Sequence, residues 1–149
     1  MTYEETLRKL GDAFNMLDAG AAAGCFSEEA VVHDPQYAEP LRGRKAIRKD
    51  FEDFFRAFPD MRSVSRNILM RDNIAAIEYD FGGTHSGTLT MNGREFSPEG
   101  KFFRGSGADF YTFDENGMIA EDRRYYDMLG LIEQLGLTER FFAETAGMR

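Results

Sequence analysis

Between Thr2 and Asp18 the apolar residues recur every three or four positions, with charged residues between them, as on one buried face of an α-helix. Thr2 followed by Glu5 has the pattern of a capping box, and Gly20 lies where a glycine commonly ends a helix. The pattern predicts an amphipathic helix with a buried stripe of Tyr3, Leu7, Leu10, Phe14 and Leu17.

A short β-prone segment, Ala30–His33, comes next, and Asp34-Pro35 ends it because the residue before a proline is disfavoured in a helix. A second stripe of helical spacing then predicts a helix that Pro59 closes, with Ile47, Phe51, Phe54, Phe55 and Phe58 on its buried face.

From Met61 onward the helical period is lost, and alternating apolar and polar residues predict mostly strands. The polar turn Arg71-Asp72-Asn73 indicates a hairpin, and Gly82-Gly83 predicts a bulge or sharp bend in a curved sheet. The remaining predicted strand regions are a polar hairpin over Thr88–Lys101 and a strand over Ala108–Phe113.

The stretch Asn116–Gly136 begins with a turn pair, continues as a strand and passes through Asp127 into a short apolar helix. Helices followed by antiparallel strands predict an α+β fold, in which a cone-shaped curved antiparallel sheet packs on N-terminal helices and encloses a pocket. We expect one domain over residues 1–149, with the tail from Leu137 serving as a capping or dimer-contact segment.

Composition narrows the possible partners. The net charge of -8, with no block of basic residues, opposes binding to nucleic acid or to anionic membranes. A single cysteine, Cys25, indicates a reducing compartment and a small apolar packing role, and no basic apolar leader or membrane-length segment is evident. We therefore expect a soluble, cytoplasmic protein.

Several short motifs, in this order and spacing, resemble those of the SnoaL-like polyketide cyclases, within the superfamily named after nuclear transport factor two. They are His33-Asp34-Pro35, Gly43-x-x-Ala46-Ile47, Phe58-Pro59-Asp60, Gly83-Thr84-His85-Ser86-Gly87, Pro98-x-Gly100-Lys101, Gly117-x-Ile119-x-Glu121, and Asp127 followed by Gln134-Leu135-Gly136. The resemblance implies a cone-shaped α+β barrel around an apolar pocket, usually dimeric or tetrameric, with no metal or organic cofactor.

Characterised cyclases of this family close a polyketide ring by an intramolecular aldol reaction, with an aspartate that corresponds to Asp127 as general acid/base. Other members of the superfamily isomerise ketosteroids or hydrolyse epoxides. Many family members carry Trp where this chain has Arg123, a difference that weakens the case for an extended aromatic substrate. The resemblance therefore implies a small hydrophobic ligand and a homodimer.

The strand before Asp127 has two faces, and its period alone does not say which one looks inward. The resemblance favours the odd-numbered face, which carries Arg123, Tyr125 and Asp127. Burial would raise the pKa of Asp127 toward the range useful for moving a proton next to a carbonyl. The alternative role for Asp127 is to cap the helix that follows it.

Other candidates have similar alternatives. His85 can donate to a substrate oxygen or share a proton with Asp127, or it can be a turn histidine bonded to a nearby carbonyl. His33 can reach the pocket mouth, whereas Asp34 is better explained by an Asx turn. Tyr79 and Tyr125 can offer hydroxyls to a carbonyl oxygen or simply pack, and we expect Phe55 and Phe58 to line the pocket or core.

Three kinds of function remain open. The first is a cofactor-independent acid/base enzyme acting on a hydrophobic carbonyl compound, and the second is a module that binds such a molecule without chemistry. The third is an interaction protein that uses the outer sheet face. Epoxide hydrolysis is the rival reaction, but it needs a second carboxylate, for which Glu78 and Asp80 are the candidates. No pair of candidate ligands has the spacing of a metal site.

Overall fold

The capping box at Thr2 is present in the computed structural model, which describes residues 1–91 and 93–147 and the side chains of 1–91 and 93–142. Helix α1 spans Tyr3–Asn15, and its first turn is closed by reciprocal 3.1 Å hydrogen bonds between Thr2 and Glu5. The predicted end near Gly20 is wrong. The helix stops before Leu17, which takes a positive φ of 58°, and Gly20 lies in a separate helix, α2 (Ala19–Ala23).

The predicted helices and strands occur in the predicted order, and the structure adds a two-residue strand before the second predicted helix and a helix at the C-terminal end. The remaining elements are β1 (Phe26–His33), β2 (Leu41–Arg42), α3 (Arg44–Ala57), β3 (Arg62–Arg71), β4 (Ile74–Thr84), β5 (Leu89–Met91), β6 (Arg94–Phe96), β7 (Phe102–Phe113), β8 (Ile119–Tyr126), α4 (Met128–Gln134) and α5 (Thr138–Gly147).

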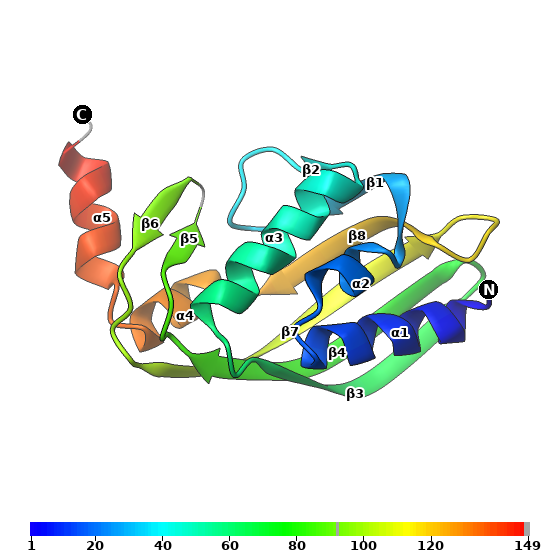
Figure 1. Cartoon of the computed structure of the whole chain (residues 1–149), viewed down its shortest axis with the longest axis horizontal. Coiled ribbons are helices and arrows are strands. Elements are labelled where there is room, and N and C mark those ends of the chain that lie inside the picture. Colours follow the sequence, from blue (N-terminus) through cyan, green and yellow to red (C-terminus); the bar gives the residue numbers. More distant parts are fainter. Residues whose placement is uncertain (92, 148–149) are drawn as a thin grey trace.

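The main sheet has the strand order β2-β1-β8-β7-β4-β3, and helices α1, α2 and α3 lie on one side of it (Figure 1). The predicted α+β class, with N-terminal helices on a curved sheet, is confirmed. The sheet is mixed rather than wholly antiparallel, because β1 pairs with β8 in parallel. It also stays open rather than closing into a barrel, because β2 and β3 at its edges do not pair.

No bulge is present between β4 and β7 at Gly82-Gly83, although a bulge is one of the two predicted alternatives. Pairing between β4 and β7 continues in register through both glycines, whereas β3 shifts register between Ser65 and Asn67. Gly82 allows close strand approach instead, because a Cβ atom there would meet the Phe103 carbonyl oxygen at 2.6 Å. The glycine therefore serves interstrand packing and does not interrupt the ladder.

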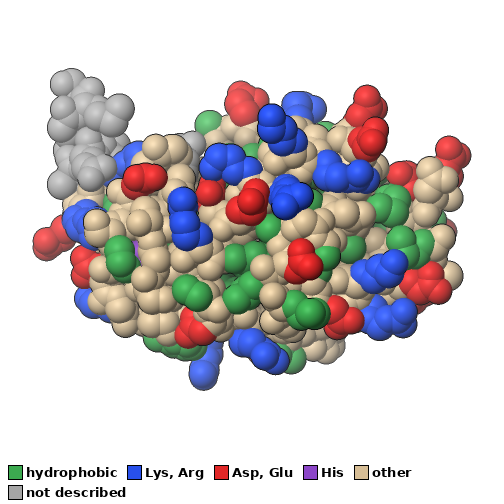
Figure 2. Space-filling model, viewed as in Figure 1, with side chains coloured by type: hydrophobic (Ala, Val, Ile, Leu, Met, Phe, Trp, Pro, Cys, Tyr) green, Lys and Arg blue, Asp and Glu red, His purple; other side chains and the backbone are tan. Residues whose placement is uncertain are grey.

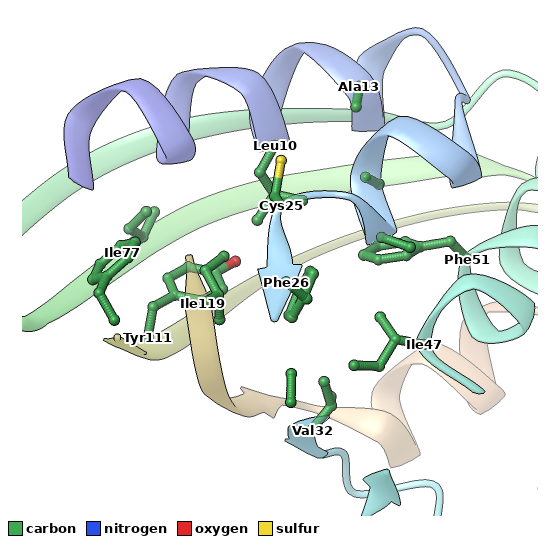
Figure 3. Packing of buried hydrophobic residues seen from close by; sticks show 14 of the residues in the cluster. Leu10, Ala13, Cys25, Phe26, Val32, Ile47, Phe51, Ile77, Tyr111 and Ile119 are labelled. Atoms are coloured by element: carbon green, nitrogen blue, oxygen red, sulfur yellow. The ribbon is translucent and has the colours of Figure 1, made fainter. Parts of the chain in front are cut away.

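Two apolar clusters hold the helices on the sheet. The first joins α1, α2 and α3 to the inner sheet face and contains Phe26, Ile47 and Ile119, all fully buried (Figure 3). Cys25 packs in this cluster, as predicted for a small apolar residue, and burial raises the pKa of its thiol. The second cluster is formed around Phe58 by buried residues of β5, β6 and α4, among others.

The outer surface is mixed in charge. On the face drawn in Figure 2, acidic and basic side chains are interspersed, and no continuous basic patch forms there. Within the part of the chain that the structure describes, no helix is both long enough and apolar enough to cross a membrane. The same residues contain no group of three His, Cys, Asp or Glu side chains placed to hold a metal ion.

Candidate functional site

A cavity of about 550 Å³ lies between the helices and the inner face of the sheet. Most of its wall is apolar, because the helical stripes of α1 and α3 and the inward residues of β4 all point into it. The phenylalanine side chains on this wall are Phe14, Phe26, Phe51, Phe54, Phe58 and Phe81. A cavity of this size and lining suits a small, largely apolar molecule.

Arg124 is the centre of a polar group at the base of the cavity. Its guanidinium group lies 2.7 Å from Asp50, 3.0 Å from Asp34 and 3.3 Å from Asp122, and its side chain is only 12% exposed. The same group sits over the ring of Phe51, 5.5 Å from its centroid. Burial acts to lower the pKa of Arg124, but the surrounding carboxylates outweigh it and hold that pKa above its ordinary value.

Three tyrosine hydroxyls fix the carboxylates of this group. Tyr126 donates to Asp34 at 2.6 Å, and Tyr37 donates to Asp50 at the same distance. Tyr79 donates to Asp109 at 2.7 Å. Burial, followed by the neighbouring carboxylate charge, raises the pKa of each of these three tyrosines, so all three remain protonated hydrogen-bond donors at neutral pH.

Asp109 and Asp122 form a pair of carboxyl groups on adjacent strands. Both are buried, and the charge of Asp109 is close enough to disfavour ionisation of Asp122. Two neighbouring carboxylates repel each other, so a proton on one of them relieves that repulsion. Burial first, and the charge of Asp109 second, raise the pKa of Asp122 well above its usual range, against the opposing effect of Arg124.

Ionisation of all four carboxyl groups would leave a large excess of negative charge in this group. Asp34, Asp50, Asp109 and Asp122 supply four carboxyl groups against the single guanidinium of Arg124. Atom Oδ1 of Asp122 is buried and accepts no hydrogen bond from a protein donor in the described part of the chain. A proton on this carboxyl group lowers the buried charge. We call these five residues the Arg124 cluster.

The inward face of β8 is the even-numbered one, so the expectation based on odd numbering is wrong. Asp122, Arg124 and Tyr126 line the cavity, while Glu121, Arg123 and Tyr125 point outward. The reason is a register shift against β7: Phe113 pairs with Ile119, but Thr112 pairs with Glu121. Ile119 is fully buried, and the shift then turns the next inward position to Asp122.

Asp127 therefore lies outside the cavity. Its side chain is exposed and accepts a 2.9 Å hydrogen bond from the backbone N–H of Gly130, which makes it the N-cap of α4. This is the capping arrangement that was the alternative to an acid/base role.

His33, Arg123 and Tyr125 lie together on the outer face of the sheet rather than in the cavity. Glu121 connects the first two, through a 2.9 Å contact with His33 Nε2 and a 3.0 Å contact with Arg123. Tyr125 packs edge-on against Phe110. These side chains border a shallow hollow behind the Arg124 cluster.

Two of the other predicted residues reach the cavity and one does not. Tyr79 and Phe58 line it, Tyr79 through its bond to Asp109. Phe55 packs behind the wall in the apolar core, edge-on to Phe14. Asp34 makes the predicted Asx turn by accepting from Gln36 N at 3.0 Å, and it also joins the Arg124 cluster.

His85 is buried in the second apolar region, away from the cavity, with its ring 5.9 Å from that of Phe58. Neither ring nitrogen has a hydrogen-bond partner of good geometry among the described residues. Burial lowers the pKa of His85, opposed in part by the backbone of Phe96 and the charge of Glu99. His85 is therefore neutral at neutral pH.

Replacing His85 with Leu is expected to reduce the loss of unfolding free energy that the parent protein shows as the pH falls. A depressed pKa in the folded state contributes stability above the unfolded pKa of about 6.5, and this stability is lost as the pH falls through the folded pKa. Leu cannot take up a proton, so the variant should gain about 1 kcal/mol or more over the parent near pH ~5. Denaturant unfolding at several pH values measures this gain.

The matched control is His33→Leu, which removes the other histidine of the chain, exposed and bonded to Glu121. We expect it to leave the acid profile close to that of the parent. Equal profiles for His85→Leu and the parent would contradict the assignment of a buried neutral ring.

Pattern reasoning did not identify Asp50, Asp109, Asp122, Arg124 and Tyr37 as site residues. The available signal was a charged residue on an otherwise apolar face: Asp50 lies between Ile47 and Phe54 on the buried stripe of α3. Asp109 likewise shares the inward face of β7 with Tyr111.

Comparison with known proteins places the chain in a family. The family model for the SnoaL-like polyketide cyclase matches residues 4–135. A search of the curated proteins finds no match.

Solved structures share the fold at low sequence identity. A putative SnoaL-like polyketide cyclase from Jannaschia sp. CCS1 superposes with a TM-score of 0.77 at 15% identity, covering 89% of this chain and 90% of that one. IdmH, a putative polyketide cyclase from Streptomyces antibioticus, gives 0.71 at 24%, covering 91% and 99%. SalBIII, an epoxide hydrolase/cyclase-like enzyme in pyran ring formation in the polyether salinomycin, gives 0.71 at 18%, covering 86% and 92%. With the family model matching most of its length, the chain belongs to the SnoaL-like polyketide cyclase family.

Proposed function

We propose that the chain is a cofactor-independent acid/base enzyme that acts on a small, largely apolar carbonyl compound, with Asp109 and Asp122 as its proton-transferring pair. The observation that carries this proposal is a pair of buried carboxyl groups on the wall of a mostly apolar cavity, in which the pKa of Asp122 is raised. Such a pair offers one ionised group and one protonated group side by side.

The chemistry is a proton transfer next to a carbonyl group. Asp109, as the carboxylate, takes a proton from the carbon beside the carbonyl, and Asp122 gives its proton to the carbonyl oxygen. The resulting enol can attack an electrophilic carbon in an aldol step or be reprotonated at carbon, which returns both carboxyl groups to their starting states. Tyr79 holds Asp109 in place through its 2.7 Å hydrogen bond.

Exchange of carbon-bound protons for deuterium tests this proposal without knowledge of the natural substrate. β-Tetralone, a compact apolar ketone, is incubated with the protein in D₂O, and NMR follows the loss of the proton signals beside its carbonyl. We expect exchange faster than in buffer alone. If the ketone binds but exchanges at the buffer rate, the non-catalytic binding module becomes the better description.

Epoxide opening is a second candidate, because the structure supplies the paired carboxyl groups that this reaction needs. Asp122 would protonate the epoxide oxygen as the C–O bond breaks, while Asp109 accepts a proton from the attacking water. Styrene oxide is a suitable probe, with diol formation as the readout. Diol formation without ketone exchange would favour this reaction over enolisation.

Replacing Asp127 separates the capping role from an acid/base role. Asp127→Asn should preserve stability to within a few tenths of a kcal/mol because Asn caps as well as Asp, whereas Asp127→Ala should cost about 1 kcal/mol. Neither change should alter ketone exchange, since the side chain lies outside the cavity. Loss of exchange in Asp127→Asn would restore Asp127 as the catalytic group.

The homodimer remains a prediction, and the outer face of the sheet is its proposed surface. Leu69, Ala76, Phe110 and Arg123 form one row across β3, β4, β7 and β8, and Leu69 and Phe110 are exposed. If a second copy covers this row, Phe110→Glu should yield monomers in sedimentation velocity, whereas Phe102→Glu, at the far end of the same strand, should not.

A further inference from the structure

Helix α1 is bonded to the sheet region at its two ends, and between them the side of the helix that faces β3 lines the cavity. At its C-terminal end Asn15 exchanges two hydrogen bonds with the backbone of Ser63 on β3, at 3.0 and 2.8 Å. At the other end the Thr6 hydroxyl donates to the Gly117 carbonyl at 2.6 Å, and Tyr3 stacks on Phe113. About 14 Å of helix separates Thr6 from Asn15.

Apolar residues of β3 line this part of the cavity without being covered. Ile68 and Met70 stand opposite the buried residues Ile77 and Ala75 on the inward side of the sheet, and both line the cavity. They are nevertheless 52% and 36% exposed. The cavity therefore continues as an apolar slot between α1 and β3, side by side in Figure 1.

Gly11 is the residue of α1 that leaves this slot open. It lies inside the helix, where glycine is unfavourable relative to alanine, and its φ is not in the left-handed region. A Cβ atom at this position would meet no atom within 4 Å, so close packing does not require glycine. Gly11 nevertheless lines the cavity beside Leu7, and what the missing side chain provides there is empty space.

We propose that the slot between α1 and β3 is a subsite for an unbranched apolar chain of the substrate, and that Gly11 determines its width. The proposal rests on the proposed function, with the carbonyl group at Asp109 and Asp122 and the chain extending toward Ile68 and Met70. The helix side of the slot carries Glu4, Arg8 and Asp12 at its rim, and the chain as a whole has a net charge of -8. An uncharged chain therefore fits this slot better than an anionic one.

A series of methyl ketones from butanone to nonanone tests the subsite, with Kd measured by calorimetry. In the parent protein Kd should fall about fourfold for each methylene that enters the slot, the ratio given by burial of one CH₂ group. Gly11→Phe should abolish this dependence for the longer ketones. Gly11→Ala and Lys9→Phe should keep it, since the first adds one methyl group and the second places the same ring at an exposed position outside the cavity.

Exchange of butanone protons in D₂O, measured on the same proteins, separates this inference from the proposed function. Exchange without any chain-length dependence of Kd in the parent overturns the subsite and leaves the acid/base proposal standing. Chain-length dependence that Gly11→Phe removes supports the subsite even when no exchange occurs. The same dependence in Gly11→Phe as in the parent overturns it.

Discussion

Asp122→Asn is expected to slow ketone exchange by a factor of about 10²–10⁴, the usual contribution of a positioned acid or base. Asn has the shape of a protonated Asp and can donate a hydrogen bond to Asp109, so the fold and the cavity should be preserved. It cannot give up a proton, and that loss alone removes the acid from the pair. NMR of β-tetralone in D₂O, with ligand affinity measured in parallel, provides the readout.

The same variant should be at least as stable as the parent at neutral pH. Because the folded-state pKa of Asp122 is raised, its contribution to stability is complete below the unfolded pKa of about 3.9 and is lost as the pH rises through the folded value. Asn remains a hydrogen-bond donor at every pH, so the stability of Asp122→Asn should decline less than that of the parent as the pH rises above about 4.

Glu121→Gln is the matched control for Asp122→Asn. It neutralises the adjacent carboxylate of β8, which bonds to His33 and Arg123 on the outer face. The exchange rate should stay within twofold of the parent value, because removing a surface charge should change the activation free energy by no more than about 0.4 kcal/mol. Equal exchange rates in Asp122→Asn and Glu121→Gln would remove Asp122 from the catalytic machinery.

Arg124→Met should destabilise the protein severely, costing about 3–5 kcal/mol of unfolding free energy. The change leaves Asp34, Asp50 and Asp122 buried without their cation, so these groups must take up protons or remain unpaired. The loss should therefore grow as the pH rises. Denaturant unfolding at acidic and neutral pH measures both the size and the trend.

Arg123→Met is the matched control. It removes the neighbouring arginine of β8, whose side chain lies on the opposite face of the strand. Arg123 is 46% exposed and pairs only with Glu121 in the described part of the chain, so its removal should cost about 0–1 kcal/mol. Similar losses for the two arginine variants would show that Arg124 is not the central cation of a buried cluster.

Features encoded locally could be predicted from the sequence. The capping box of Thr2 and Glu5, the helical stripe of α3 and the passage from β8 through Asp127 into α4 each depend on neighbouring residues, and each is present. The inward face of β8 could not be predicted, because one register shift after Ile119 reverses the parity that the alternating pattern suggests.

The Arg124 cluster illustrates a second limit of pattern reasoning. A charged residue on the apolar stripe of α3 marks Asp50 as unusual, but nothing near it identifies a partner. Arg124 lies 74 residues from Asp50 and 90 residues from Asp34, so these contacts exist only once the tertiary fold is formed. Local sequence patterns therefore carry no information about which residues the cluster brings together.

The parallel pairing of β1 with β8 has a consequence for how the chain acquires its fold. β1 is made early in synthesis, yet its partner begins at Ile119, so this part of the sheet forms only when most of the chain is available. Pairings between distant segments slow folding, because loop closure precedes the gain from contact. Until β8 docks, Asp34 and Asp50 lack their guanidinium partner and the inner edge of β1 is unpaired. A nascent chain that ends before Tyr126 is thus expected to be a target for chaperones and proteases.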